Sequence, residues 1–220
     1  MYDSIVSVWC GVLLLFCGCA PQEQVPYDTS DQPVTGAMEG MKKYEYLVCD
    51  GGPHLALPAE LSGDWKGAPS ISAVTNPSSD YGRAMTATSA DPIALITVGS
   101  GEAIVLQDPP MTAWGNPTEE GVDLYQLLDW RTMKLDDLID QAVATTPTLS
   151  MSDTGLSVSL TEPDLVLLFA GDRPGDTAYG EYRIPLSSGN YRILEGRFSD
   201  PASGTLNIYR LAPTTESSQP

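Results

Sequence analysis

Short apolar runs separated by Gly, Pro, Asp and Ser make up most of the chain from about Tyr44 onward, a pattern typical of β-strands joined by turns. The most apolar pair of runs is Ile93 to Val98 and Glu102 to Leu106, both rich in β-branched and aliphatic residues. Gly99-Ser100-Gly101 lies between them and supplies residues suited to a tight turn. We therefore predict a hairpin here that is buried on both faces.

A second hairpin is predicted nearer the N-terminus. Tyr44 to Cys49 and His54 to Leu57 flank Asp50-Gly51-Gly52-Pro53, a turn signal of the kind that joins two strands. Later strands are predicted where apolar residues run together or alternate with polar ones, at 165–169, 181–186, 191–194 and 206–211. The turn signal at 187–190 is expected to link the second and third of these strands.

One segment has the period of an amphipathic helix. Its apolar positions fall at i, i+3, i+4, i+7 and i+8, namely Leu135, Leu138, Ile139, Ala142 and Val143. Asp136 is placed to cap this helix, with Asp137 in its first turn, and a shorter helical turn is predicted at 59–61. The whole pattern predicts an α+β fold that is mainly β, with antiparallel sheets, hairpins and one or two packed helices.

Residues 1–19 are predicted to be a signal peptide of the lipoprotein type. Ile5 to Phe16 is an apolar run too short to span a bilayer but suited to the core of a signal peptide. The run ends in Leu15-Phe16-Cys17-Gly18-Cys19, which resembles the lipobox of bacterial lipoprotein precursors and implies a diacylglyceryl group on the Cys19 thiol. Acyl chains anchor a protein because each buried CH₂ contributes roughly 0.8 kcal/mol.

Two features leave other locations open. Gly18 and Ala20 also fit an ordinary small-x-small cleavage site, which implies a secreted, lipid-free product. The first residues, MYDS, carry no Lys or Arg, so a misplaced start codon and a cytoplasmic chain form a third reading. We expect a lipid-anchored envelope protein facing the periplasm or the exterior, with secretion and the cytoplasm as alternatives.

The chain after the signal is predicted to divide into three parts. Residues 20–43 are polar, contain three prolines and have no apolar period, which is typical of a flexible tether. Residues 44–213 are expected to form a single domain, and residues 214–220 a disordered tail. Because three of the four cysteines lie in the signal, Cys49 is the one thiol expected in the folded part, and no disulfide framework is predicted.

The net charge narrows the choice of partners. With 29 acidic and 11 basic residues, the chain carries a formal charge of −18, which repels nucleic acids and anionic lipid surfaces. Membrane contact is therefore expected through the lipid anchor only. The charge favours a basic protein partner, although an acidic surface that keeps an exported protein soluble explains it equally well.

Few groups in the sequence suit catalysis. His54 is the only histidine and follows a Gly-Gly-Pro turn, so we interpret it as a turn or strand-edge residue, and Cys49 as inert packing in an apolar strand. Ser100 lacks the Gly-x-Ser-x-Gly pattern of an activated serine. No zinc or calcium spacing is present, so we predict no metal and no cofactor. A carboxylate pair for glycoside hydrolysis stays open.

Several spaced residues between 44 and 115 form a recognisable set. They are Gly51, Gly52, Pro53, Trp65, Asp80, Tyr81, Arg83, Gly99, Gly101, Glu102 and Trp114. In spacing and identity this set resembles the bacterial immunity protein 21 family, with a looser continuation at 165–169 and 183–191. The resemblance implies a protein that neutralises a toxin of a polymorphic toxin system by stoichiometric contact, with these residues as family motif or partner contacts.

The same residues also have structural interpretations. The glycines suit turns, Asp80 and Arg83 suit an ion pair that holds the fold, and Trp65 and Trp114 suit either the core or an interface. We expect a binding protein whose partner is a basic toxin, rather than an enzyme. The alternatives are a surface lipoprotein that binds a carbohydrate or peptide, an envelope hydrolase, and a domain of unknown function on the immunity fold.

Overall fold

The computed structural model describes residues 44–214 apart from positions 50, 75 and 132–133. The predicted signal with Cys19, the predicted tether and most of the predicted tail lie outside these described residues. One sheet has six strands: β1 (Glu45–Val48), β5 (Met111–Trp114), β6 (Val122–Trp130), β11 (Gly204–Pro213), β10 (Gly189–Asp200) and β7 (Ser152–Leu160). The other has five: β3 (Ile93–Val98), β4 (Gly101–Leu106), β2 (His54–Pro58), β8 (Leu165–Phe169) and β9 (Glu181–Ile184).

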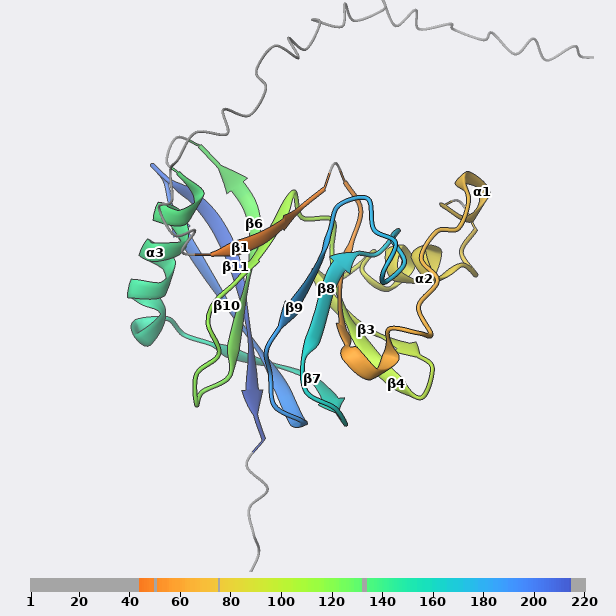
Figure 1. Cartoon of the computed structure of the whole chain (residues 1–220). Helices are drawn as coiled ribbons and strands as arrows, with labels where there is room; N and C mark the ends of the chain where they lie inside the picture. The colour runs from red at the N-terminus through yellow and green to blue at the C-terminus, as the bar shows by residue number, and fades with distance from the viewer. Residues whose placement is uncertain (1–43, 50, 75, 132–133, 215–220) are drawn as a thin grey trace, which may run out of the picture. The chain divides into compact units, whose positions relative to one another are not determined.

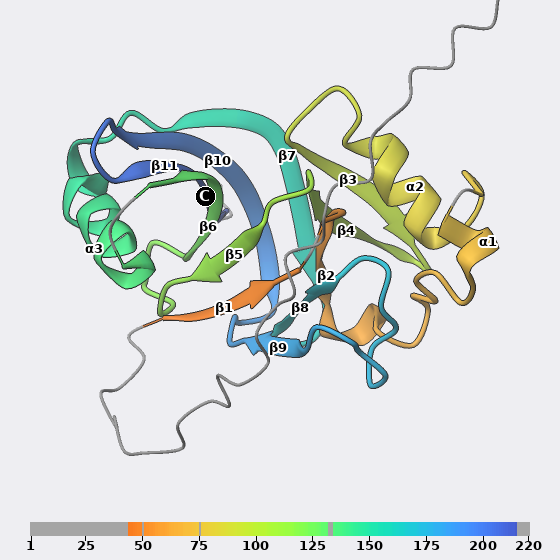
Figure 2. The same ribbon diagram turned by 90° about the horizontal axis from the view of Figure 1, so that it is seen from above.

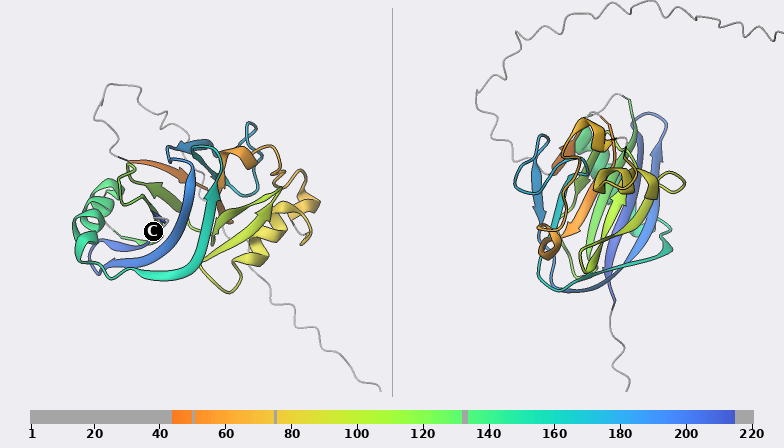
Figure 3. Two further views of the ribbon diagram at one scale, coloured as in Figure 1. Left: turned by 90° about the horizontal axis from the view of Figure 1, so that it is seen from below. Right: turned by 90° about the vertical axis from the view of Figure 1, so that its right-hand side faces the viewer.

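Helical segments cover the outer faces of the two sheets. The α-helices are α1 (Ile71–Val74), α2 (Asp80–Ala87) and α3 (Leu135–Thr145), and the 3₁₀ turns are η1 (Ala59–Leu61) and η2 (Thr146–Thr148). Figure 1 shows the order α3, six-stranded sheet, five-stranded sheet, α2 across the fold, and Figure 3 shows α2 and α3 on opposite sides. All strand pairs are antiparallel, which confirms the prediction of a mainly β, α+β fold.

The core lies in three apolar layers. The largest is between the sheets and includes Leu106, Leu124 and Leu167. The second lies between the five-stranded sheet and α2, where Trp65 and Tyr81 pack on β2 and β8. The third lies between the six-stranded sheet, which is strongly curved in Figure 2, and the buried face of α3. Strands in the middle of such a stack are apolar on both faces, which explains why the most aliphatic runs form β4 and β8.

The hairpin predicted around Gly99 is confirmed. β3 and β4 pair with Val98 opposite Gly101, so Gly99 and Ser100 form the turn. Gly99 has φ +54°, a left-handed conformation that glycine adopts without a steric penalty. The last four residues of β4 are buried, whereas β3 is an edge strand with Thr97 exposed, so burial on both faces holds for β4 only.

The hairpin predicted around Asp50-Gly51-Gly52-Pro53 is wrong. β1 pairs with β5 in the six-stranded sheet, whereas β2 pairs with β4 and β8 in the five-stranded sheet. The turn signal between them marks a crossing from one sheet to the other. The turn signal at 187–190 does link the two strands predicted on either side of it, β9 and β10, but β9 belongs to the five-stranded sheet and β10 to the six-stranded sheet. Turn residues set only the local direction of the chain. Which strand the next one pairs with depends on where its apolar side chains can be buried.

The amphipathic helix is confirmed as α3, and the predicted helical turn as η1. The predicted capping role of Asp136 is wrong, since Lys134 occupies the N-cap position without a side-chain hydrogen bond. Asp136 and Asp137 lie in the first turn, where carboxylates interact favourably with the helix dipole. Within the described residues, no helix is both long and apolar enough to cross a membrane.

Candidate functional site

The two tryptophans of the predicted motif are core residues. Trp65 is fully buried on the five-stranded sheet, and its Nε1 donates a hydrogen bond to the carbonyl oxygen of Ala170 at 3.2 Å. Trp114 lies in the layer between the sheets, with its ring 5.2 Å from that of Tyr182. Of the two roles left open by the sequence, the core is therefore the one that these side chains occupy.

Asp80 and Arg83 hold α2 against the rest of the fold. Arg83 Nη2 lies 2.7 Å from Asp80 Oδ1, and Arg83 Nη1 donates to the carbonyl oxygen of Thr97 in β3. Asp80 Oδ2 accepts from the backbone N–H of Lys66. The Ser79 hydroxyl caps the helix by accepting from Gly82 N–H. The pair thus joins α2, an edge strand and the loop after Trp65, which is a structural role.

The remaining motif residues lie at or beside turns, except Tyr81, which is buried between the five-stranded sheet and α2. Gly51 and Glu102 are exposed, and Pro53 is buried at the start of β2. Gly52 has φ +103°, and an added Cβ would lie 2.6 Å from the Tyr81 hydroxyl. Gly101 packs against Leu61. None of the eleven motif residues lines the pockets described below, so the structure does not bring them together at one open site.

A buried relay of three side chains connects the sheets beside Gly52. Cys49 Sγ is 2.9 Å from His54 Nε2, and His54 Nδ1 is 2.8 Å from Thr112 Oγ1. Cys49 follows β1 and Thr112 is in β5, both in the six-stranded sheet, whereas His54 begins β2 in the other sheet. His54 is therefore in a central strand, and its interpretation as a turn or strand-edge residue is wrong.

The relay has the connectivity of a thiol nucleophile, a base and a group that orients the base. His54 is fully buried, and burial lowers its pKa from 6.5 to about 4 despite the opposing charge of Asp108. A neutral imidazole fits a thiol that donates to Nε2 and an Nδ1–H that donates to Thr112. Cys49 is also buried, and no pocket described below reaches it. The geometry supports a hydrogen-bonded bridge between sheets.

Metal binding has little support in this part of the chain. Among the described residues, no group of three or more His, Cys, Asp or Glu side chains is arranged to hold a metal ion. The carboxylate of Asp172 instead accepts hydrogen bonds from the backbone N–H groups of Ala178 and Tyr179. The 172–176 segment is thus held as a loop between β8 and β9, in agreement with its turn-forming sequence.

An acidic hairpin projects from the six-stranded sheet. We use this name for the connection between β5 and β6, residues 115–121, which has Glu119 and Glu120 at its tip. Thr118 and Gly121 exchange two backbone hydrogen bonds of 2.8 and 3.0 Å, which close the turn beneath the two glutamates. Both glutamates are exposed. The hairpin therefore presents two adjacent carboxylates to solvent.

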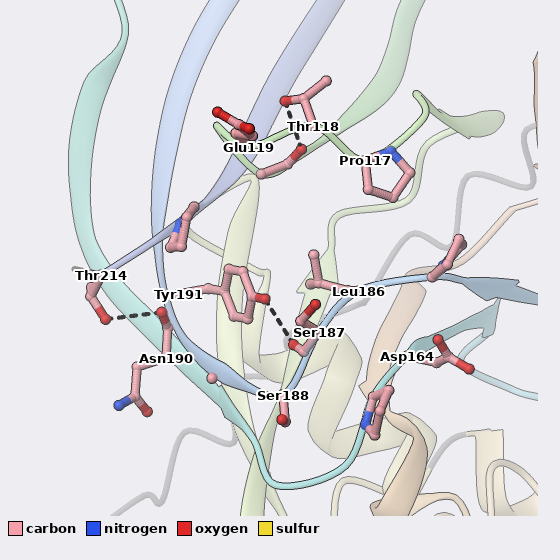
Figure 4. A pocket seen from close by; sticks show the side chains of 15 residues that line it. Pro117, Thr118, Glu119, Asp164, Leu186, Ser187, Ser188, Asn190, Tyr191 and Thr214 are labelled. Carbon is pink, nitrogen blue, oxygen red and sulfur yellow. Dashed lines mark hydrogen bonds between the residues drawn. The ribbon is translucent and has the colours of Figure 1, made fainter. Parts of the chain in front are cut away.

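One pocket, the end pocket, lies on one side of the acidic hairpin and has a volume of about 820 Å³. Figure 4 shows Tyr191 and Leu186 at its centre, between Pro117 of the hairpin and Ser187 of the β9–β10 connection. The Tyr191 hydroxyl donates to the Ser187 carbonyl oxygen at 2.7 Å. Three further prolines, several hydroxyl side chains and the carboxylates of Glu119 and Asp164 also line it, so the pocket is partly apolar and partly polar.

A second pocket, the side pocket, lies between the acidic hairpin and the end of α3 and has a volume of about 900 Å³. Its apolar lining comes from Val143, Leu149, Met151 and Tyr125. Three carboxylates, those of Glu119, Glu120 and Asp123, line it together with the guanidinium of Arg210. The two pockets share Thr118, Glu119 and Gly121, so the acidic hairpin forms a wall of both.

Arg210 fixes the base of the acidic hairpin. Its Nε and Nη2 donate to the two carboxylate oxygens of Asp123 at 2.7 and 3.0 Å, and its Nη1 donates to Glu120 at 2.9 Å. The hydrogen bonds that Arg210 donates to Asp123 raise the pKa of its guanidinium further. Arg210 therefore pairs with Asp123 and Glu120, whereas Glu119 makes no ion pair among the described residues.

Two tyrosines that line the side pocket have raised pKa values. The pKa of Tyr44 is raised by burial and then by Asp140, whose carboxylate accepts a 2.9 Å hydrogen bond from the Tyr44 hydroxyl. The pKa of Tyr125 is raised by burial and then by the charge of Asp123. The carboxylates of Asp140 and Asp123 therefore disfavour further negative charge near these two neighbouring rings, whose centroids are 6.3 Å apart.

The sequence did not assign the acidic hairpin or the side pocket to a site, although the looser continuation of the family motif at 183–191 covers part of the end pocket. The available signal was the string Pro117-Thr118-Glu119-Glu120-Gly121, which combines turn-forming residues with two adjacent charges. Its significance depends on Val143 and Arg210, which lie far away in the sequence.

Comparisons with known proteins add no assignment, since no family model, no curated protein and no solved structure matches the chain. The resemblance to immunity proteins stays a prediction.

Proposed function

We propose that this protein binds and neutralises a basic protein by stoichiometric contact, in the manner of an immunity protein, and that Cys19 anchors it to the cell envelope. The observation that carries the proposal is the acidic hairpin, which presents Glu119 and Glu120 between two open pockets. A net charge of −18 supports the same conclusion, since it accelerates the encounter with a basic partner. A protein that blocks a toxin by contact needs no catalytic group.

The relevant experiment is a neutralisation assay. The full chain, carrying a C-terminal affinity tag, is purified in detergent from its native cells, and copurifying proteins are identified and quantified. We expect one basic protein in a fixed stoichiometric ratio. Expressed alone in a host, that protein should stop growth, and co-expression of the full chain should restore it. Copurification without toxicity, or toxicity without protection, would contradict the proposal.

Anchoring is tested separately. Cys19→Ala removes the thiol that takes the lipid, so we expect the variant to leave the membrane fraction, whereas Cys49→Ala should stay in it. Unchanged fractionation of Cys19→Ala would contradict a lipid anchor. Protection from an envelope-acting toxin should fall with the anchor, because tethering raises the local concentration of the protein at the membrane.

The end pocket favours a second candidate, a protein that binds a carbohydrate or peptide. Tyr191 and Leu186 offer an apolar floor, and hydroxyl and amide groups from Ser187, Ser188 and Asn190 surround it. Glu119 and Asp164 also line this pocket, but Figure 4 shows them at opposite ends of it, which does not favour the paired carboxylates of a glycosidase. Saturable glycan binding that Ser188→Trp abolishes would support this candidate over neutralisation.

A further inference from the structure

We propose that the side pocket receives a basic, amphipathic segment of the protein partner, with its apolar side chains against the end of α3 and a Lys or Arg against the acidic hairpin. This inference rests on the proposed function and specifies the contact. The pocket volume of about 900 Å³ is enough for the side chains of one or two helical turns or of a short strand.

The apolar half of the pocket continues the buried face of α3. Leu138, Ile139 and Ala142 pack on the six-stranded sheet, and Val143 extends the same stripe in the sequence. Val143 nevertheless is 40% exposed. Leu149 and Met151, each partly buried, lie beside it in the pocket lining. Covering this surface removes apolar area from water, which stabilises a complex.

The charged half of the pocket favours a partner segment of positive charge. Glu119 and Glu120 project from the acidic hairpin, and Asp123 lies at its base. Arg210 is the one cationic side chain in the described lining, and its Nε, Nη1 and Nη2 each already donate to Asp123 or Glu120. An anionic segment would meet uncompensated repulsion from Glu119, whereas a Lys or Arg adds a favourable pairing.

The two halves line the same pocket, which explains the amphipathic requirement. Val143 comes from α3 and Glu119 from the acidic hairpin, and the same pocket touches both. A purely basic segment would leave the apolar half exposed to water. A purely apolar segment would cover the carboxylates without offering them a charged partner. Only a segment with both characters satisfies the pocket.

The test uses a defined probe, a fluorescein-labelled helical peptide of Lys and Leu, with a Glu-and-Leu peptide of the same pattern as the sign control. Binding to the full chain in neutral detergent is followed by anisotropy. We expect saturable binding of the Lys peptide, weakened about tenfold by Glu119→Lys and by Val143→Glu. Each variant has a matched control on the other side of the fold, Asp91→Lys for charge and Met85→Glu for an exposed apolar helix residue.

The controls should stay within about twofold of the native chain, because neither residue lines the side pocket. Equal weakening by variants and controls, or no binding at low salt, would overturn the inference. The same four variants are then tried in the neutralisation assay. Protection that survives Glu119→Lys and Val143→Glu leaves the proposed function standing and overturns the pocket assignment. Peptide binding that follows the pocket, without any toxin, supports the pocket assignment and contradicts the proposed function.

Discussion

At the scale of single residues, His54 makes stability depend on pH. Burial holds its pKa at about 4 in the folded chain against 6.5 in the unfolded chain. As pH falls from 6.5 to 4, the unfolded chain takes up a proton that the folded chain refuses, so the free energy of unfolding drops by roughly 3 kcal/mol. We expect His54→Gln to flatten this part of the curve. Urea unfolding at pH 7 and pH 4.5 measures it, and an unchanged difference would contradict the assignment.

The reactivity of the Cys49 thiol shows whether the relay is structural or catalytic. Its thiol is buried, lies 2.9 Å from His54 Nε2 and lines none of the pockets, so reagents do not reach it in the folded chain. We expect iodoacetamide to alkylate Cys49 slowly in the native full chain and at least about a hundredfold faster in urea. Peptide mapping separates this site from the N-terminal cysteines. Rapid native labelling would indicate an activated nucleophile and reopen catalysis.

Trp65 is a third residue with a defined consequence. It is fully buried between the five-stranded sheet and α2, and its indole N–H is bonded. Trp65→Ala should lower the free energy of unfolding by about 3–5 kcal/mol through the cavity and the lost hydrogen bond. Thermal melting measures the loss. A variant of native stability that fails to bind its partner would instead place Trp65 at the interface.

At the scale of elements, the sequence predicts most strands and the pairing of β3 with β4, but not the other partners. Local composition is enough for β3, β4 and β8, because aliphatic and β-branched residues suit buried strands wherever they pair. The polar β7, with alternating exposed positions, and α2, with Gly82 in a weakly apolar segment, carry no comparable signal. The segment around Gly52 resembles a hairpin turn locally, yet the chain changes sheets there because β1 and β2 cover opposite sides of the central core.

That crossing gives a prediction with a built-in control. Gly52 has φ +103°, and an added Cβ would lie 2.6 Å from the Tyr81 hydroxyl and 2.7 Å from the Phe169 ring. Gly175 has φ +80°, but a Cβ added there would meet no heavy atom within 4 Å, so Gly175→Ala should cost about 1 kcal/mol for backbone strain alone. Gly52→Ala should cost at least about 2 kcal/mol more through the clash. Equal losses in urea unfolding would show that the crossing relaxes freely.

At the scale of the whole molecule, the candidate site depends on contacts that no local pattern predicts. Glu119, Val143 and Arg210 meet at the side pocket only because the six-stranded sheet places the acidic hairpin beside the end of α3. The net charge, in contrast, can be counted from the composition. It indicates the sign of the charge on a partner but not where that partner binds. The motif residues that the sequence did single out are used mainly for turns, an ion pair and packing, which are structural roles.

The net charge therefore has to be tested against the simpler explanation of solubility. If the charge of −18 steers a basic partner, association should slow at least tenfold between about 0.05 and 0.5 M NaCl, because the screening length falls from about 14 to about 4 Å. Dissociation should change far less, since short-range contacts in the pocket control it. Stopped-flow rates with the neutralised partner measure both. A salt-independent association rate would assign the acidic surface to solubility and leave binding to the apolar half of the side pocket.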